Sequence, residues 1–142
     1  MDRKFIVYVN EAASDPGLLT CGVPQGSILG PLLFLLYVND MPQATKSELL
    51  LYADDSCIFF QHKDVNTIQT QLNEDFSNLC DWFVDNKLSI HFGDEKTKSI
   101  LFASKWKVKK ASKLEISYKS IDIKQHSKVT YLGCIIDETL SG

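Results

Sequence analysis

The sequence lacks a long uninterrupted apolar run. The longest extends from Ile28 to Val38, 11 residues that include Gly30 and Pro31, whereas a helix that crosses a bilayer needs about 20 apolar residues. The amino-terminal residues also lack the apolar stretch and small-residue cleavage site of a secretory signal peptide. We therefore expect no membrane partner and an intracellular protein, of the nucleus or the cytoplasm, without a targeting signal that would choose between them.

Clustered metal-ligating or redox side chains are also missing. No two of the four cysteines have the C-x-x-C spacing of zinc or redox motifs, and the three histidines are 29 and 35 residues apart. Isolated cysteines within apolar runs behave as small buried hydrophobic residues, which suits a reducing compartment. A zinc site or a redox pair is thus not expected. These residues are Cys21, Cys57, Cys80 and Cys134, and His62, His91 and His126.

An excess of charge of one sign is absent as well, since the net charge is only −3. The charges are nevertheless segregated along the chain. Residues 1–95 hold 5 Lys or Arg and 14 Asp or Glu, whereas residues 96–128 hold 10 Lys and 2 acids, Glu115 and Asp122. Clustered lysines can bind the phosphates of a nucleic acid, although charge runs are more often solvated loops. Both interpretations of this lysine-rich segment remain open.

What is present is the composition of a folded domain, with 44% hydrophobic and 23% charged residues over 142 positions. The β-branched and aromatic residues 5–9 predict a strand. After the Gly- and Pro-containing loop 22–26, Ser27 is expected to cap a helix that tolerates Pro31 in its first turn and continues through residues 32–41. This helix is apolar on nearly every side, which predicts burial on nearly every side.

A hairpin is expected next, because the apolar segments 49–52 and 56–60 flank the short polar turn at Ala53, Asp54 and Asp55. Apolar residues then recur at steps of three and four, which predicts an amphipathic helix over residues 65–86. Either Asp64 or Asn66 can cap that helix. Further strands are expected at residues 88–92, 99–103, 114–118 and 129–136, with a lysine-rich connection at 106–113.

This order of elements predicts an α+β fold, in which one mostly antiparallel sheet has helices packed on one face. The length of 142 residues fits one domain. A sheet that is open at the hairpin would expose an unpaired edge. We therefore expect residues 49–60 to be prone to aggregation and the isolated chain to be marginally stable.

Asp54 and Asp55 are the first candidates for chemistry. Two adjacent carboxylates oppose each other's ionisation, and a divalent cation removes this conflict. Mg²⁺ binds carboxylate oxygens and keeps coordination sites open for phosphate, and two such ions can activate an attacking hydroxyl and stabilise a leaving group. Two aspartates are, however, also ordinary turn residues, so the segment from Tyr52 to Asp55 does not by itself decide between the two.

The loop before the first helix is the second candidate. Gly26 lets the backbone approach a ligand closely, Gln25 offers an amide that donates and accepts, and Ser27 begins a helix whose amino terminus favours anions. An ordinary loop that leads into a helix explains the same residues equally well. The loop alone therefore leaves its function open.

Taken together, the two segments closely resemble the reverse transcriptase family. The family's segment beside the template and the incoming nucleotide is similar to Gly22-Val-Pro-Gln-Gly-Ser-Ile-Leu-Gly-Pro-Leu-Leu-Phe-Leu-Leu-Tyr-Val-Asn-Asp40, and its metal-binding hairpin, the YADD motif, is similar to Tyr52-Ala-Asp-Asp55. The next motif is similar to the helix over 65–86 followed by Lys96-Thr97 and Ser99-Ile-Leu-Phe102. Finally, the primer-grip hairpin of LINE-type enzymes, from non-LTR retrotransposons, resembles Tyr131-Leu-Gly-Cys-Ile-Ile-Asp137.

The resemblance implies a role for each matching residue. Asp54 would be the principal catalytic metal ligand and Asp55 a supporting acid, with Mg²⁺ or Mn²⁺ as the cofactor. The implied reaction is attack of the 3′-hydroxyl of a DNA primer on the α-phosphate of a deoxynucleotide (dNTP), copied from an RNA template. The nucleotide and template pocket would include Pro24, Gln25, Gly26, Ser27, Tyr52 and Lys96, and the primer grip would be Tyr131, Leu132 and Gly133.

The sequence also departs from the family pattern. The family has a further metal-binding aspartate on a strand upstream of the Gly22 loop, whereas here only Asp2 and Asp15 precede that loop, neither in a matching segment. The fingers and the thumb have no counterpart either. We therefore expect residues 1–142 to be a partial polymerase palm that is not active alone. The alternatives are a catalytically dead retroelement relic and a nucleic-acid-binding module that reuses the palm through its lysine-rich segment.

Overall fold

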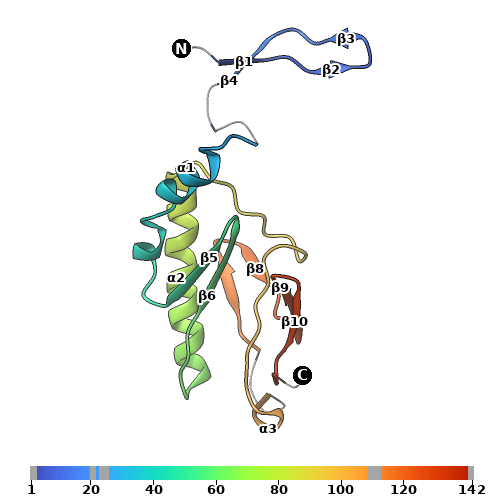
Figure 1. Ribbon diagram of the computed structural model, residues 1–142. Helices are drawn as coiled ribbons and strands as arrows, with labels where there is room; N and C mark the ends of the chain where they lie inside the picture. Colours follow the sequence, from blue (N-terminus) through green and yellow to red (C-terminus); the bar gives the residue numbers. More distant parts are fainter. Residues whose placement is uncertain (1–2, 20–21, 23–25, 109–112, 141–142) are drawn as a thin grey trace. The chain divides into compact units, whose positions relative to one another are not determined.

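The computed structural model describes residues 3–19, 22, 26–108 and 113–140 (Figure 1). The chain forms two compact units, residues 1–38 and residues 39–142, and each is considered by itself. Among the described residues, no helix combines the length and the apolar character that crossing a membrane requires.

The first unit begins with a β-hairpin in two parts. Strands β1 (Arg3–Phe5) and β4 (Gly17–Leu19) pair at its base, and β2 (Tyr8–Val9) and β3 (Ala12–Ala13) pair further out. The strand predicted over residues 5–9 is therefore divided. The division has a local cause. Val7 lies between β1 and β2, and its N–H donates to the hydroxyl of Ser14 at 3.0 Å rather than to a backbone carbonyl.

Helix α1 (Gly30–Tyr37) is shorter than the sequence predicts. Its N-cap residue is Leu29, which makes no side-chain capping bond, so the prediction that Ser27 caps this helix is wrong, whereas Pro31 lies in the first turn as expected. A longer helix would soon meet Pro42, which has no N–H to donate and disfavours helical backbone at the residue before it. The helix therefore ends before the predicted residue 41.

The prediction of burial around α1 is also wrong. Gly30 is the buried residue of the helix, whereas its leucines are exposed, up to 66% for Leu36. An apolar surface shows that a helix favours contact with other apolar groups, but burial also requires a neighbouring layer. The exposed side chains of this segment are Ile28, Leu29, Leu32, Leu33, Leu35, Leu36 and Tyr37.

In the second unit, a hairpin and a long helix lie where the sequence predicts them. Strands β5 (Glu48–Tyr52) and β6 (Asp55–Phe59) pair in an antiparallel manner. Helix α2 (Val65–Asp85) begins after its N-cap residue Asp64, whose carboxylate accepts a backbone hydrogen bond from the first turn at 2.9 Å. Asp64 is thus the cap, and Asn66 lies inside the helix.

The remaining strands form two further hairpins, β7 (Ile116–Tyr118) with β8 (Ile121–Ile123) and β9 (Lys128–Tyr131) with β10 (Cys134–Asp137). The lysine-rich connection contains a short helix, α3 (Lys105–Val108). The predicted α+β class is confirmed. Within the described ranges, however, the strands form five separate two-stranded antiparallel sheets rather than one sheet.

Two predicted strands do not form in the described chain. Residues 88–92 have no ladder partner, and within residues 99–103 only Ser99 has one, in an isolated parallel bridge to Gln125. Side chains of both segments, such as Phe92, nevertheless pack against the core. Alternating apolar residues therefore predicted burial correctly here, but strand pairing also needs a backbone partner at the right distance.

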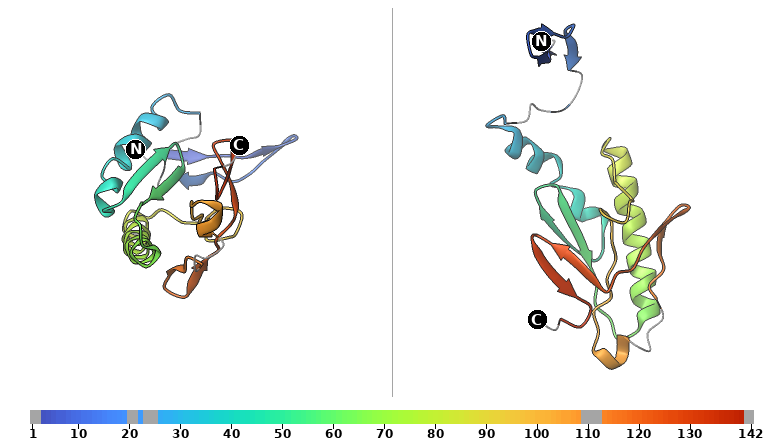
Figure 2. Two further views of the ribbon diagram at one scale, coloured as in Figure 1. Left: turned by 90° about the horizontal axis from the view of Figure 1, so that it is seen from below. Right: turned by 90° about the vertical axis from the view of Figure 1, so that its right-hand side faces the viewer.

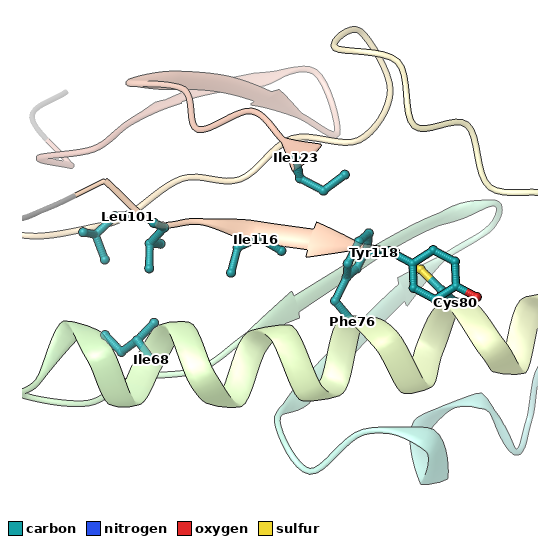
Figure 3. Packing of buried hydrophobic residues seen from close by; sticks show 8 residues of the cluster. Ile68, Phe76, Cys80, Leu101, Ile116, Tyr118 and Ile123 are labelled. Atoms are coloured by element: carbon teal, nitrogen blue, oxygen red, sulfur yellow. The ribbon is translucent and has the colours of Figure 1, made fainter. Parts of the chain in front are cut away.

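The core of the second unit lies between α2 and β7 (Figure 3). Ile58 of β6 and Phe60 pack against the same cluster, and both views of Figure 2 show the β5–β6 hairpin close to α2. The cluster therefore connects this hairpin to the helix. Its buried members are Ile68, Phe76, Cys80, Leu101, Leu114, Ile116, Tyr118 and Ile123.

Polar side chains of α2 also bind the backbone of β7 and of Glu115, the residue just before it. Asn73 Oδ1 accepts a hydrogen bond from Ser117 N–H at 2.9 Å, and Asn73 Nδ2 donates to the carbonyl of Glu115 at 2.7 Å. Gln69 Oε1 accepts from Glu115 N–H at 2.9 Å. These bonds satisfy backbone groups that a strand edge would otherwise leave unpaired, so α2 holds β7 through both apolar and polar contacts.

Candidate active site

The β5–β6 hairpin carries the two candidate metal ligands at its turn. Tyr52 and Asp55 are the last paired residues, so the turn consists of Ala53 and Asp54. Ala53 has a φ of 52°, and the two-residue turns that hairpins favour require a positive φ at this first central position. The local sequence thus places two consecutive carboxylates at the outer end of a tight hairpin.

One face of this hairpin lies on the core and the other is open. Leu49, Leu51 and Ile58 are half-buried, whereas Leu50 is 49% and Tyr52 is 63% exposed. Directly paired residues share a face, and Asp55 is paired with Tyr52. The carboxylate of Asp55 therefore belongs to the open face.

Both carboxylates are exposed, and no described lysine or arginine forms an ion pair with either of them. In the part of the chain that the structure describes, no third His, Cys, Asp or Glu joins them to enclose a metal ion. Mg²⁺ is commonly held by one or two carboxylates, while water and substrate phosphates complete its octahedral shell. The donor set therefore fits a divalent cation that is shared with a phosphate ligand, and among the described residues it does not fit an enclosed metal site.

A carboxylate from α2 holds the chain just before β5, after the 3-10 helix η1 (Met41–Ala44). Asp75 is 0% exposed. Its Oδ1 accepts from Lys46 N–H at 2.8 Å, and its Oδ2 accepts from Ser47 N–H at 3.0 Å and from Gln71 Nε2 at 3.1 Å. Burial has the largest effect and raises the pKa of Asp75, but the hydrogen bonds from Ser47, Lys46 and Gln71 together outweigh it and hold the pKa below its ordinary value.

Sequence reasoning missed Asp75. The sequence nevertheless contains an indication of its role. Asp75 is an acid within the apolar stripe of the predicted helix, between Leu72 and Leu79 and next to Phe76. Such a residue predicts a buried carboxylate that needs hydrogen-bond partners. The two backbone partners lie 28 and 29 residues earlier in the chain, and no local pattern identifies them.

The loop before α1 is described only in part, since Pro24 and Gln25 lie outside the described residues. Gly26 is exposed and has a φ of 81°, a conformation that other residues rarely adopt. A Cβ added there would meet nothing within 4 Å, so the backbone is open to a ligand. The carbonyl of Ser27 accepts a hydrogen bond from Gly30 N–H at 3.2 Å, which closes a turn ahead of the helix.

Lys96 lies in a turn that begins at Gly93, whose carbonyl accepts a hydrogen bond from Lys96 N–H at 2.8 Å. Its side chain is exposed, and within the described ranges it forms no ion pair. On the same turn, Asp94 is already paired with Lys124 at 2.8 Å. The Lys96 ammonium is therefore available to a phosphate or another anion.

Tyr131, Leu132 and Gly133 form the end of the β9–β10 hairpin that the family resemblance implies. The single strand predicted over residues 129–136 is therefore wrong, because this turn divides it. Tyr131 pairs with Cys134, and the two residues between them have φ values of 48° and 80°. Positive φ at both central positions is the property of a type I′ turn. Tyr131 is half-buried, whereas Leu132 is 47% exposed, so the turn presents an apolar side chain to solvent.

Residues 2–136 match the family described as reverse transcriptase (RNA-dependent DNA polymerase). This range covers the loop before α1, the β5–β6 hairpin and most of the β9–β10 hairpin. The chain belongs to the reverse transcriptase family. The resemblance that the sequence motifs indicated is thus confirmed.

Three curated relatives of this reverse transcriptase chain come from mobile elements of Drosophila melanogaster, which supports a LINE-type origin. It is 28% identical to the probable RNA-directed DNA polymerase from transposon X-element, over 98% of this chain and 15% of the relative. It is 30% identical to the probable RNA-directed DNA polymerase from transposon BS, over 99% and 16%. It is 28% identical to the RNA-directed DNA polymerase from mobile element jockey, again over 99% and 16%. The chain thus spans about a sixth of their length. No solved structure matches it significantly.

Proposed function

We propose that this chain forms the metal-binding part of the palm of an RNA-directed DNA polymerase. One observation carries the proposal: the β5–β6 register leaves Asp54 and Asp55 exposed and without ion pairs among the described residues, on a hairpin packed against α2. The proposed reaction joins the 3′-hydroxyl of a DNA primer to the α-phosphate of a deoxynucleotide, directed by an RNA template. Family membership supports this reaction class.

In this proposal the chain supplies positions and charges. Asp54 and Asp55 would hold Mg²⁺ or Mn²⁺, which when bound neutralises phosphate charge and favours the ionised hydroxyl. Gly26 lets the backbone approach the nucleotide, Lys96 offers its ammonium to the leaving pyrophosphate, and the Tyr131–Gly133 turn steadies the primer end. Positioning and charge stabilisation provide most of the catalysis in phosphoryl transfer generally.

We do not expect the chain alone to polymerise. Two carboxylates are only part of the proposed metal site, and the further carboxylate, the fingers and the thumb would come from other parts of a longer polymerase. The relatives are long enough for such parts, since the chain spans 15% to 16% of them. An assay of the purified chain should show no incorporation of nucleotide. Metal-dependent incorporation that Asp54→Asn abolishes would contradict this expectation.

Titration calorimetry with Mn²⁺ tests the metal site directly. We expect saturable binding to the wild-type chain and an affinity roughly tenfold or more weaker in the double variant Asp54→Asn/Asp55→Asn. Loss of the groups that merely support metal ligands already lowers metal affinity by about tenfold or more, and loss of the ligands themselves should lower it further. The matched control is Asp94→Asn/Glu95→Gln. It removes the same charge from another exposed pair of adjacent acids, and it should bind Mn²⁺ like the wild type.

Two results would overturn the proposed metal site. One is equal weakening in both double variants, which would mean that Mn²⁺ responds only to net charge. The other is no binding to a wild-type chain that circular dichroism shows to be folded. That second result would favour the catalytically dead relic.

The exposed lysines of residues 96–128 support a second candidate function, which is nucleic-acid binding without catalysis. Lys107, Lys113, Lys119 and Lys128 are exposed, and Trp106 is 67% exposed among them. Aromatic side chains beside lysines can stack on bases while the ammonium groups meet phosphates. Salt-dependent RNA binding that needs no Mg²⁺ and survives Asp54→Asn would favour this function over the polymerase palm.

A further inference from the structure

We propose that Asp75 is a positioning residue: by binding the backbone just before β5, it sets where that strand starts and so where the Asp54–Asp55 turn lies. The importance of the turn rests on the proposed function. The positioning itself rests on the contacts of Asp75, which lies 20 residues beyond the turn on helix α2.

The carboxylate of Asp75 bridges two successive backbone amides. Lys46 N–H and Ser47 N–H donate to different oxygens of the same carboxylate, at 2.8 and 3.0 Å, and β5 begins at the next residue, Glu48. Two bonds to one rigid group fix the intervening peptide plane in orientation as well as in distance. Bonds to an ionised acceptor are also roughly twice as strong as neutral ones.

Asp75, rather than its neighbours, makes the main link between α2 and the start of β5. The ion pair between Lys46 and Glu74 joins the same two segments, but the two side chains are 67% and 47% exposed, and exposed ion pairs contribute little. Ser47 is buried at 8% exposure and Asp75 at 0%. The buried carboxylate is therefore the stronger link between α2 and the start of the hairpin.

The start of β5 matters to the turn because strand register is all-or-none. Each residue of a strand advances about 3.3 Å, and successive side chains point to opposite faces. A slip of one residue at Ser47 would therefore move the far end of β5 by about 3 Å and exchange its two faces. Asp55, now on the open face with Tyr52, would then turn toward the core. A metal site needs its ligands placed within about 0.5 Å.

Native-state amide hydrogen exchange on the whole chain tests the positioning. Asp75→Asn keeps the shape of the side chain but turns an amide NH₂ toward a backbone N–H. We expect the amides paired between β5 and β6 to exchange about tenfold to hundredfold faster, with a smaller change in β7–β8. The matched control is Asn73→Ala on the same helix, which releases β7 instead and should give the reverse pattern.

Gln71→Ala keeps the test decisive if Asp75→Asn does not fold. It removes one of the three hydrogen bonds to the carboxylate, so a smaller increase in exchange, of several-fold, is expected in the same hairpin. Equal changes in both hairpins would overturn the proposal. So would β5–β6 amides that are as unprotected in the wild type as in the variants.

Mn²⁺ titration of the same variants separates this proposal from the proposed function. Weaker binding in Asp75→Asn than in Asn73→Ala would show that the anchor acts on the turn. Faster exchange in Asp75→Asn with unchanged Mn²⁺ affinity would show that Asp75 does not position the metal-binding turn. If the wild type binds no Mn²⁺, the proposed function fails, while the exchange comparison still decides whether Asp75 positions the hairpin.

Discussion

Ala53 adopts a backbone conformation in the metal-binding turn that glycine adopts more readily. Its φ of 52° lies in the left-handed region, where a residue with a Cβ is held at a cost of about 1 kcal/mol or more. The β9–β10 turn differs, because Gly133 occupies one of its two positions of positive φ. The β5–β6 turn therefore depends on the pairing of its strands to keep Asp54 and Asp55 in place.

Replacing Ala53 by glycine should stabilise the chain. We expect Ala53→Gly to raise the free energy of unfolding by roughly 0.5–1 kcal/mol, because relief of the left-handed alanine outweighs the added freedom of the unfolded chain. Urea denaturation measures this change. Ala44→Gly, at a position of negative φ, is the control and should lower the stability by a similar amount. A loss of stability in both variants would show that Ala53 is not strained.

Among the elements, α2 organises the second unit with two kinds of contact. Its apolar stripe forms the core with β7 and with Ile58 of β6, and three of its polar side chains bind backbone groups of neighbouring segments. Asn73 and Gln69 bind β7 or the residue just before it, and Asp75 binds the residues before β5. One helix thus fixes two hairpins that do not pair with each other.

The buried carboxylate of α2 should make stability sensitive to acid. The pKa of Asp75 is lowered in the folded chain, whereas that of an unfolded aspartate is about 3.9. The unfolded state therefore binds more protons below about pH 4, and stability is lost as the pH falls through the folded pKa. The Gln71 amide binds the same carboxylate, and the Lys46 ammonium, which is paired with Glu74, interacts with it electrostatically.

Urea denaturation between pH 6 and the acid range measures this dependence. Asp75→Asn should be less stable than the wild type near neutral pH, and the difference should shrink as the pH falls below about 4. Other carboxyls with lowered pKa, such as those of Asp64 and Asp94, remain in both proteins and cancel in the comparison. A difference that stays constant with pH would mean that the ionised form of Asp75 adds no stability.

At the scale of the whole molecule, much apolar surface stays in contact with water. Leu36, Leu50, Tyr52 and Ile135 are each 49% to 75% exposed, and each described sheet has only two strands. Isolated two-stranded hairpins are marginal in water, and unpaired edges invite association. These features give a structural reason for the marginal stability expected from the sequence, which stays a prediction.

We expect the isolated chain to unfold over a broad temperature range. Its free energy of unfolding should be less than about 5 kcal/mol, which is the lower end of the range for ordinary domains. Thermal melts followed by far-ultraviolet circular dichroism and by tryptophan fluorescence should not coincide. Leu50→Lys on the open face of the hairpin should reduce aggregation, whereas Gln43→Lys, at an exposed position of η1, should not. A sharp cooperative melt of a monomer would contradict this expectation.

The sequence by itself determined the features that depend on neighbouring residues. The Tyr52–Asp55 turn and the helix from Val65 follow from turn chemistry and from a period of three to four residues, which act over a few positions. The turn at Leu132 and Gly133 does not, because the pattern predicted one strand over residues 129–136 where the structure has two. The family likewise follows from short motifs. For these features the structure confirmed the sequence and added the choice of Asp64 as the helix cap.

Tertiary structure alone decided the features that depend on distant partners. Division into separate two-stranded sheets, the missing strand at residues 88–92, the exposed face of α1 and the role of Asp75 each depend on which segments meet in space. An apolar residue favours burial, and a buried carboxylate requires donors. Neither property predicts which backbone segment supplies the partner, because the partners are tens of positions apart in the sequence.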